Sequence, residues 1–367
     1  MKVMVFMKKI IINILIICLV GGISLMILNN VNKTSSSDKN VENNTENNNQ
    51  TSQVENKDEK TNDTTDIKNN LVSYNGWLKI ESNTLVNEKN EKFQLRGMST
   101  HGIQWYGNFA NEEMIKKLRD EWGSNLFRIA MYTNENGYIQ NKNIENEVTN
   151  VVDIAIKLDM YVIIDWHILS DNNPQTYKEE AKDFFKRMSE KYKDYPNVIY
   201  EICNEPNGNV TWNEDIKPYA EEVINVIREN SKESIIIVGT PTWSQDVDKA
   251  KENPINDKNV MYALHFYAGT HTEYLREKAK SVLTSIPIFV SEWGVSDASG
   301  NGGVYLEEAQ KWIDFMKENN ISWANWSLSD KNESSALLKS GSPNNSLDDN
   351  CLSESGKFIK RVMLESK

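Results

Sequence analysis

Two glutamates in short motifs are the residues of this sequence best suited to chemistry. Glu205 stands in an Asn-Glu-Pro turn after the apolar run 198–203, and Glu292 stands in a Ser-Glu-Trp-Gly segment after the apolar run 288–290. Cleavage of a glycosidic bond needs one carboxylic acid to protonate the leaving oxygen and one carboxylate to meet the cationic carbon. The sequence has no Gly-rich phosphate loop after a strand, no HExxH motif and no GxSxG elbow, so competing chemistries lack their parts. The pair therefore indicates a glycosidase.

Both motifs fall into a regular alternation of short apolar runs and longer amphipathic segments. Continuously apolar runs are typical of parallel strands, and eight of them alternating with helices predict a (β/α)8 TIM barrel. Before them, segments 77–80 and 93–95 flank the polar loop 87–90, which predicts an N-terminal β-hairpin. The predicted strands are Gln94–Met98, Leu126–Met131, Tyr161–Asp165, Val198–Cys203, Ile235–Val238, Val260–Leu264, Ile288–Val290 and Ser322–Trp326. The predicted helices are Asn111–Trp122, Lys142–Leu158, Thr176–Lys193, Asn213–Glu229, Thr272–Leu283 and Val304–Asn319.

The carboxyl ends of these strands should carry the site, because barrel enzymes build their active sites there. The fourth and seventh strands lie on roughly opposite sides, so Glu205 and Glu292 can face each other across the barrel mouth. Arg128 lies within an apolar run, and a buried guanidinium needs a carboxylate, which Glu292 or Glu205 could supply. Other strand ends carry rings that suit the hydroxyls and apolar faces of sugars. These are His101, Trp105, Tyr132, His167, Trp243, His265, Tyr267 and Trp326.

The composition of the chain indicates which cofactors and partners to expect. A carboxylate–histidine metal cluster built on His101, His167 and His265 is a less favoured alternative, and no metal or cofactor is expected. The formal net charge of −12 leaves no basic stripe for phosphates, so a nucleic-acid partner is not expected. Cys203 and Cys351 give neither a disulfide framework nor a CxxC zinc motif. We expect a monomer, since no feature of the sequence indicates an obligate partner.

The first 70 residues differ from the rest. Three lysines precede the apolar segment 10–28, so residues 1–28 are expected to be a cleaved signal peptide or a membrane anchor. Residues 29–70 are rich in Asn, Ser, Thr and charged residues, which predicts a disordered linker. Residues 71–367 would then form the catalytic barrel outside the cell, secreted or tethered to the cell surface.

Six motifs, taken in order, resemble glycoside hydrolase family five, and most closely its bacterial endo-β-1,4-glucanases (cellulases). The resemblance covers the chain from about residue 72 onward and implies a retaining enzyme with no cofactor. It implies that Glu205 is the general acid/base and Glu292 the nucleophile. The motifs are RGMSTHG (96–102), FRIAMY (127–132), ICNEP (202–206), HFY (265–267), SEWG (291–294) and NWSLSDK (325–331).

The resemblance also implies roles for the neighbouring residues. Asn204 would hold a sugar 2-hydroxyl, Arg128 and Tyr267 would keep Glu292 ionised and aimed, and His265 would hydrogen-bond Glu205 or a substrate oxygen. The sugar would be lined by His101, Tyr132 and His167, by the stacking platforms Trp105, Trp243 and Trp326, and by the hydroxyl ligands Lys331 and Glu333.

A β-1,4-linked glucan such as cellulose is the substrate that the resemblance implies. A β-mannanase or a mixed-linkage β-glucanase of the same fold stays open as an alternative, because specificity in this fold lies in loop residues. A non-catalytic carbohydrate-binding surface protein is a further alternative, which the presence of both carboxylates disfavours. No carbohydrate-binding module is recognisable in the sequence, so efficient attack on crystalline cellulose is not expected.

Overall fold

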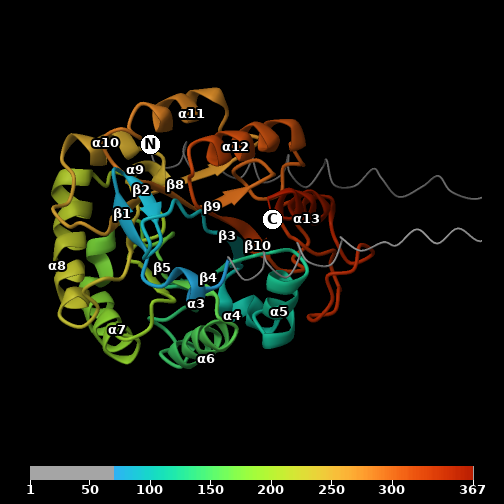
Figure 1. The fold of residues 1–367 in the computed structure, drawn as a ribbon, viewed down its shortest axis with the longest axis horizontal. Coiled ribbons are helices and arrows are strands. Elements are labelled where there is room, and N and C mark those ends of the chain that lie inside the picture. The colour runs from blue at the N-terminus through green and yellow to red at the C-terminus, as the bar shows by residue number, and fades with distance from the viewer. Residues whose placement is uncertain (1–69, 367) are drawn as a thin grey trace, which may run out of the picture. The chain divides into compact units, whose positions relative to one another are not determined.

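The computed structural model describes residues 70–366, and its centre is a closed barrel of parallel strands (Figure 1). The strands follow one another around the barrel in chain order, and β10 pairs back to β3. The predicted (β/α)8 barrel is confirmed. The strands are β3 Arg96–Thr100, β4 Leu126–Tyr132, β5 Tyr161–His167, β6 Val198–Glu201, β7 Ile236–Val238, β8 Val260–Tyr267, β9 Ile288–Gly294 and β10 Trp323–Leu328.

The expected signal or anchor and nearly all of the expected linker lie outside the described residues. No helix within residues 70–366 combines the length and the apolar character that crossing a membrane would require.

Helices surround the barrel because each has an apolar face that packs on the strands (Figure 1). In α6, for example, the residues buried at helical spacing are Ile144, Val148, Val151, Val152 and Ala155. Each predicted helix is present with slightly shorter bounds, whereas α10 and α13 were not predicted. The helices are α5 Glu112–Asp120, α6 Ile144–Lys157, α7 Lys178–Lys191, α8 Lys217–Arg228, α10 Val247–Glu252, α11 Glu273–Lys280, α12 Leu306–Glu318 and α13 Glu354–Glu365.

The N-terminal hairpin is present, but its predicted second strand was wrong. β1 (Lys79–Glu81) pairs antiparallel with β2 (Thr84–Val86), whereas segment 93–95 was expected in that place. Ser82 and Asn83 join the strands with φ angles of 51° and 60°. Two successive positive φ angles are what a type I′ hairpin turn requires, and the right-handed strand twist favours that turn. The polar loop 87–90 forms a second, separate turn.

The barrel interior has two halves, which follow from the alternation of side chains along each strand. Near the strand starts it is apolar, and we call this the apolar half: Leu126, Tyr161, Ile163, Ile199, Ile237, Met261, Ala263, Phe289 and Ala324. Two positions further along β4, β5, β6, β8 and β9 the buried side chains are polar or charged. We call this layer the ionic floor: Arg128, Asp165, Glu201, His265 and Ser291.

Candidate active site

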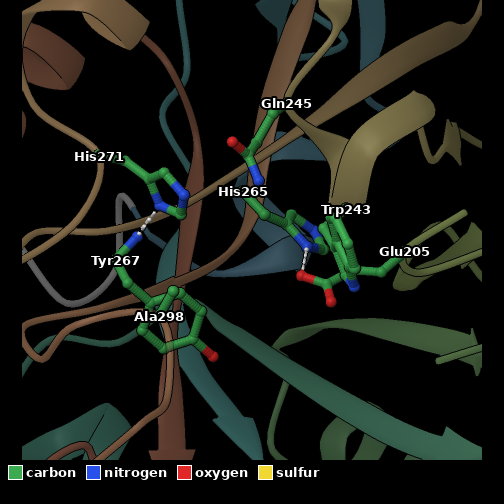
Figure 2. Close-up of a pocket in the computed structure, with 7 residues that line it drawn as sticks. All are labelled: Glu205, Trp243, Gln245, His265, Tyr267, His271 and Ala298. Atoms are coloured by element: carbon green, nitrogen blue, oxygen red, sulfur yellow. Dashed lines mark hydrogen bonds and ion pairs between the residues drawn. The ribbon is translucent and has the colours of Figure 1, made fainter. Parts of the chain in front are cut away.

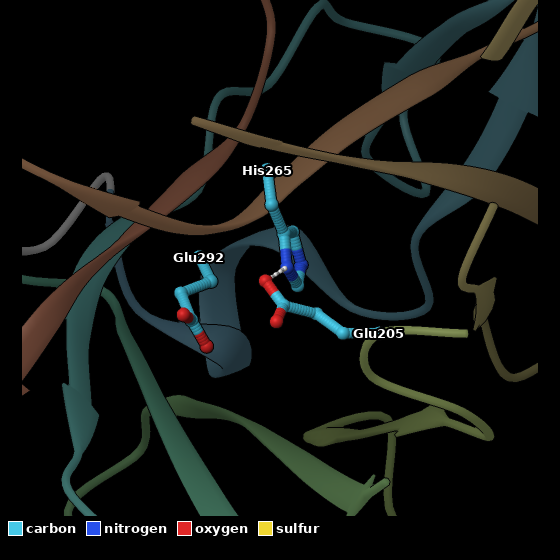
Figure 3. A group of neighbouring side chains, drawn as sticks. All are labelled: Glu205, His265 and Glu292. Atoms are coloured by element: carbon cyan, nitrogen blue, oxygen red, sulfur yellow. Dashed lines mark hydrogen bonds and ion pairs between the residues drawn. The ribbon is translucent and has the colours of Figure 1, made fainter. Parts of the chain in front are cut away.

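Glu205 and Glu292 lie together above the ionic floor. Glu292 belongs to β9, and Glu205 lies in the loop that follows β6. Their carboxyl groups point toward one another, with the His265 ring beside Glu205 (Figure 3). One oxygen of each carboxyl group and one ring nitrogen of His265 all lie within 4.8 Å of one another. Both glutamates are largely buried, at 8% and 4% exposure, so water screens their charges poorly.

Glu292 is surrounded by groups that favour its ionised form. The Tyr267 hydroxyl donates a hydrogen bond to Oε1 over 2.7 Å, and Nη1 of Arg128 donates to Oε2 over 3.1 Å. Burial alone would raise the pKa of Glu292, but the positive charges of His265 and Arg128 hold this pKa below its ordinary value. Glu292 is therefore an ionised carboxylate, and a hydrogen bond to each oxygen fixes its orientation.

Burial and the neighbouring charge of Glu292 together favour the protonated form of Glu205. Burial, followed by the negative charge of Glu292, raises the pKa of Glu205 to about 7, although a hydrogen bond with His265 opposes the rise. That bond joins Nδ1 of His265 to Oε1 of Glu205 over 3.0 Å. Two carboxyl groups in one site with opposed pKa shifts can divide acid and base work between them.

Arg128 organises the floor beneath the pair. It is fully buried, and its Nε donates to Oε2 of Glu201 over 2.7 Å while Nη2 donates to Oε1 over 3.2 Å. Nη2 also lies 3.0 Å from Oδ2 of Asp165. The expected carboxylate partner is thus Glu292, together with two acids that the sequence analysis did not assign to the site. Within residues 70–366, Glu205 is not among the ion-pair partners of the guanidinium.

Asn204 is held by the same floor. Its Oδ1 accepts a hydrogen bond from Nη2 of Arg128 over 2.7 Å, and its Nδ2 lies 3.2 Å from Nε2 of His167 and donates to the Ile168 carbonyl over 3.1 Å. Burial lowers the pKa of His167 to about 3, so the ring is neutral. Its proton sits on Nδ1, 2.6 Å from Oδ2 of Asp165, which leaves Nε2 to accept from Asn204. Both amide protons of Asn204 therefore already take part in hydrogen bonds. A sugar hydroxyl that accepts a hydrogen bond from Asn204 must share one of these protons.

Two adjoining cavities run across the site. One has a volume of about 450 Å³ and is lined by the residues drawn in Figure 2: Glu205, Trp243, Gln245, His265, Tyr267, His271 and Ala298. The other has a volume of about 390 Å³ and is lined on its far side by Trp105, Trp326, Lys331 and Glu333. Both cavities share Glu205, Trp243, Tyr267 and Ala298, so one cleft passes over the carboxyl pair.

Stacked rings line the second cavity. The ring centroids of Tyr132 and His167 lie 4.1 Å apart, and His167 stacks on Trp326 at 5.4 Å. The ring centroids of His101 and Trp326 lie 4.9 Å apart, and Nε2 of His101 is 3.2 Å from Nζ of Lys331. Every residue that the sequence predicted for the substrate therefore lines the cleft or, like Arg128 and Asn204, lies directly beneath it.

The sequence analysis missed several residues of the site. Asp165, Glu201 and Ser291 complete the ionic floor, and an acid inside an apolar run was a signal for the first two. Gln245 and His271 line the first cavity. Nδ1 of His271 accepts a hydrogen bond from the backbone N–H of Tyr267 over 2.8 Å, a turn contact that the sequence pattern did not reveal.

Distance alone would allow a metal ion between Glu205, His265 and Glu292. Hydrogen bonds and two carboxylates offset the effect of burial and raise the pKa of His265 to about 9, so its ring carries both protons near neutral pH. A metal ion would have to displace one of these protons, which weakens its binding to this donor set near neutral pH. Within residues 70–366, His101, His167 and His265 do not form a metal-binding group either.

A closed (β/α)8 barrel with two buried carboxyl groups at its mouth defines the class of barrel glycoside hydrolases. The family model described as cellulase (glycosyl hydrolase family 5) matches residues 86–332, and the chain belongs to this family. The resemblance seen in the motifs is thereby confirmed.

Relatives and solved structures agree with the family match. The chain is 57% identical over 292 residues to an endoglucanase of Clostridium saccharobutylicum and 59% identical over 276 residues to endoglucanase A of Evansella cellulosilytica. These alignments cover 79% and 74% of this chain but only 65% and 57% of the relatives. The structure matches cellulase Cel5C_n with a TM-score of 0.77 at 48% identity, covering 80% of this chain and 93% of the other. It matches the catalytic domain of Thermobifida fusca endoglucanase Cel5A, in complex with cellotetraose, with a TM-score of 0.77 at 35% identity, covering 80% and 98%.

Proposed function

We propose that the protein is a retaining endo-β-1,4-glucanase that hydrolyses cellulose or a related β-glucan, with Glu205 as general acid/base and Glu292 as nucleophile. The observation that carries this proposal is the opposite electrostatic setting of the two buried carboxyl groups. Arg128 and Tyr267 favour the charged form of Glu292, while burial beside that charge favours the protonated form of Glu205. One acid and one carboxylate are the two groups that glycosidic cleavage requires.

The first step forms a glycosyl-enzyme. An oxygen of Glu292 attacks the anomeric carbon, and the bond from that carbon to the glycosidic oxygen breaks. The electron pair of this bond stays on the departing oxygen, which takes the proton of Glu205. As Glu205 becomes negative, the Nδ1–H of His265 is in place to stabilise the new charge over a distance of 3.0 Å.

The second step releases the sugar. Glu205, now a carboxylate, takes a proton from a water molecule whose oxygen attacks the anomeric carbon, and the ester bond to Glu292 breaks. Glu292 returns to its hydrogen bonds with Arg128 and Tyr267. Retention is supported by the short distance between the carboxyl groups, since one oxygen of Glu205 lies within 4.8 Å of one oxygen of Glu292. Inverting enzymes separate their carboxyl groups by about 6.5–9.5 Å to admit water.

An internal attack on a long chain is supported by the cleft. Two cavities of about 450 and 390 Å³ adjoin at Glu205, and their combined space can hold several sugar units of one chain. Trp105 and Trp243, each 43% exposed, offer flat faces to sugar rings. A β-1,4-glucan is favoured over mannan because the similar proteins are endoglucanases and because the similar Thermobifida fusca structure holds cellotetraose.

We also propose that the enzyme acts outside the cell, as a monomer, either secreted or tethered through residues 10–28. The proposed location rests on the lysines and the apolar segment at the start of the sequence, whereas the proposed monomer rests on the lack of any sequence feature that indicates an obligate partner. Fractionation of cells expressing the full chain tests it: activity retained in the cytoplasm would contradict it.

The catalytic proposal is tested by Glu292→Gln, which keeps the size of the side chain and removes the nucleophile. We expect hydrolysis of soluble β-1,4-glucan to fall by a factor on the order of 10⁴ or more. Glu190→Gln is the matched control, because Glu190 is an exposed residue of α7 outside the cleft, and its activity should equal that of the unmodified protein. Equal activity of the two variants would overturn the assignment.

Substrate and stereochemistry have their own measurements. A panel of soluble cellulose derivative, mixed-linkage β-glucan, mannan and xylan ranks the substrates, and activity on mannan alone would replace the glucanase by a mannanase. Proton NMR of the first product formed distinguishes the β anomer, which retention predicts, from the α anomer, which inversion predicts.

A further inference from the structure

A chain of hydrogen bonds joins the acid/base to the ionic floor through the His265 ring. Oγ of Ser291 donates to Oε1 of Glu201 over 2.6 Å and lies 2.9 Å from Nε2 of His265. Nδ1, the other ring nitrogen of His265, lies 3.0 Å from Oε1 of Glu205. Glu201, Ser291 and His265 are at most 1% exposed, so solvent does not compete for these bonds.

The direction of each bond follows from the fixed charge at the bottom of the chain. Burial alone would raise the pKa of Glu201, but Arg128 and His265 lower it to about 2. Glu201 is therefore an acceptor, and the single hydroxyl proton of Ser291 points to it. The Ser291 oxygen can then only accept from His265, which places a proton on Nε2.

His265 carries a second proton because of the charges that face it. Glu201 from β6, Glu205 from the following loop and Glu292 from β9 present carboxyl groups to the ring. Burial alone would lower the pKa of His265, but the bonds with Glu201 and Glu205 raise it to about 9. The other titratable groups near the carboxyl ends of the surrounding strands include Arg128 and Tyr132 on β4, Asp165 and His167 on β5, and Tyr267 on β8.

We propose that Ser291 and Glu201 are positioning residues for the acid/base, because they stabilise the proton on Nε2 of His265, so that the ring stays doubly protonated and its Nδ1–H carries a positive charge toward Glu205. This inference rests on the proposed role of Glu205. With Nδ1–H bonded to Oε1, the acidic proton of Glu205 occupies Oε2, the oxygen left free for the glycosidic oxygen. During the first step this proton moves to the leaving oxygen, and His265 keeps both of its own.

Loss of the Ser291 hydroxyl removes the acceptor that holds the Nε2 proton. The ring then becomes neutral at a lower pH and keeps its remaining proton on Nδ1. Without the positive ring, Glu205 loses a neighbour that lowers its pKa, so the pKa of Glu205 rises. The alkaline limb of the pH profile should therefore move upward even though the first catalytic step becomes slower.

The test compares Ser291→Ala with Ser291→Thr, which keeps a hydroxyl, and with Ser99→Ala. Ser99 is a buried residue whose hydroxyl contacts Nη1 of Arg128 at 3.2 Å, so this control removes a hydroxyl near the floor without touching His265. Nitrogen-15 NMR of labelled histidine follows the protonation of His265, and kcat/KM is measured across pH. In Ser291→Ala we expect the His265 titration to move down by about one pH unit or more. The alkaline limb should move up by less, because the ring stays partly protonated where Glu205 titrates. Ser291→Thr and Ser99→Ala should keep both near their original positions.

Two results would overturn the inference: a His265 titration and an alkaline limb that stay in place in Ser291→Ala, or shifts of the same size in Ser99→Ala. The NMR readout needs no turnover. If the unmodified protein fails to hydrolyse glucan, the proposed function fails, while the titration of His265 still decides whether Ser291 holds its proton.

Discussion

The two halves of the barrel interior are built from the same strands but hold opposite kinds of side chain. In β4 the inward residue Leu126 is followed two positions later by Arg128, and in β5 Ile163 is followed by Asp165. The apolar half packs hydrocarbon against hydrocarbon, which stabilises the fold. The ionic floor places charges where water cannot reach them, which carries a desolvation cost that only mutual pairing offsets.

The difference teaches why the site can hold one carboxyl group charged and another protonated. A buried cation and several acids share a poorly screened volume, so each small displacement changes the balance among them. The apolar half supplies a rigid base, since close-packed side chains have few alternative positions. The residues that stabilise the fold and the residues that surround the chemistry are thus only two positions apart on the same strands. Substitutions in either half should show whether their effects on stability and on activity are separate.

The largest effect is expected from Arg128→Met, which breaks the ionic floor. Without the guanidinium, Asp165, Glu201 and Glu292 lose a shared positive partner inside the barrel. We expect the free energy of unfolding, measured with urea, to fall by about 3–5 kcal/mol, together with loss of hydrolysis. Arg187→Met is the control, because Arg187 pairs with Glu145 at the surface and should cost at most about 1 kcal/mol. Equal losses in the two variants would remove the special status of the floor.

Ile163→Ala breaks the apolar half instead. Ile163 is completely buried, and its truncation leaves a cavity beneath the floor. We expect the free energy of unfolding to fall by about 2–5 kcal/mol, while kcat/KM of the folded protein changes little well below the unfolding temperature. A large fall in kcat/KM in protein shown to be folded would mean that the two halves are not separable.

The pH profile sharpens the comparison because it reports the carboxyl pair and the ionic floor beneath it, and not the apolar half. Glu205 must be protonated, and its pKa is raised to about 7, so kcat/KM should fall about tenfold per unit as pH rises above that value. Glu292 must be ionised, and its pKa lies below the ordinary 4.5, so the acid limb should lie below that pH. Both limbs belong to the coupled set of groups rather than to single residues. Ile163→Ala should keep both limbs, and a shifted limb in that variant would contradict the assignment.

Much of this arrangement was predictable from the sequence, because strand alternation and strand ends are local signals. The barrel, the carboxyl pair and the need of Arg128 for a carboxylate all followed from them. The full set of partners of Arg128 could not be predicted. Glu201 lies at the end of a strand, and which of its side chains face the barrel interior is fixed only when the neighbouring strands pair. The hairpin was misplaced for a similar reason: the turn at Ser82 and Asn83 uses two positive φ angles that no glycine marks.

The smallest effect on activity is expected at the mouth of the barrel above the ionic floor, and Trp243→Ala tests this. Trp243 is 43% exposed and lines both cavities, on a short segment, α9 (Pro241–Ser244), whose φ at Trp243 is 53°. Loss of one stacking face should lower kcat/KM on cello-oligosaccharides by roughly 2- to 10-fold, equivalent to about 0.5–1.5 kcal/mol, with little change in the free energy of unfolding. Tyr195→Ala is the matched control, because Tyr195 is 42% exposed but precedes β6, at the opposite end of the barrel. Equal activity losses in the two variants would mean that exposed rings act through general stability rather than by stacking on sugar at the mouth.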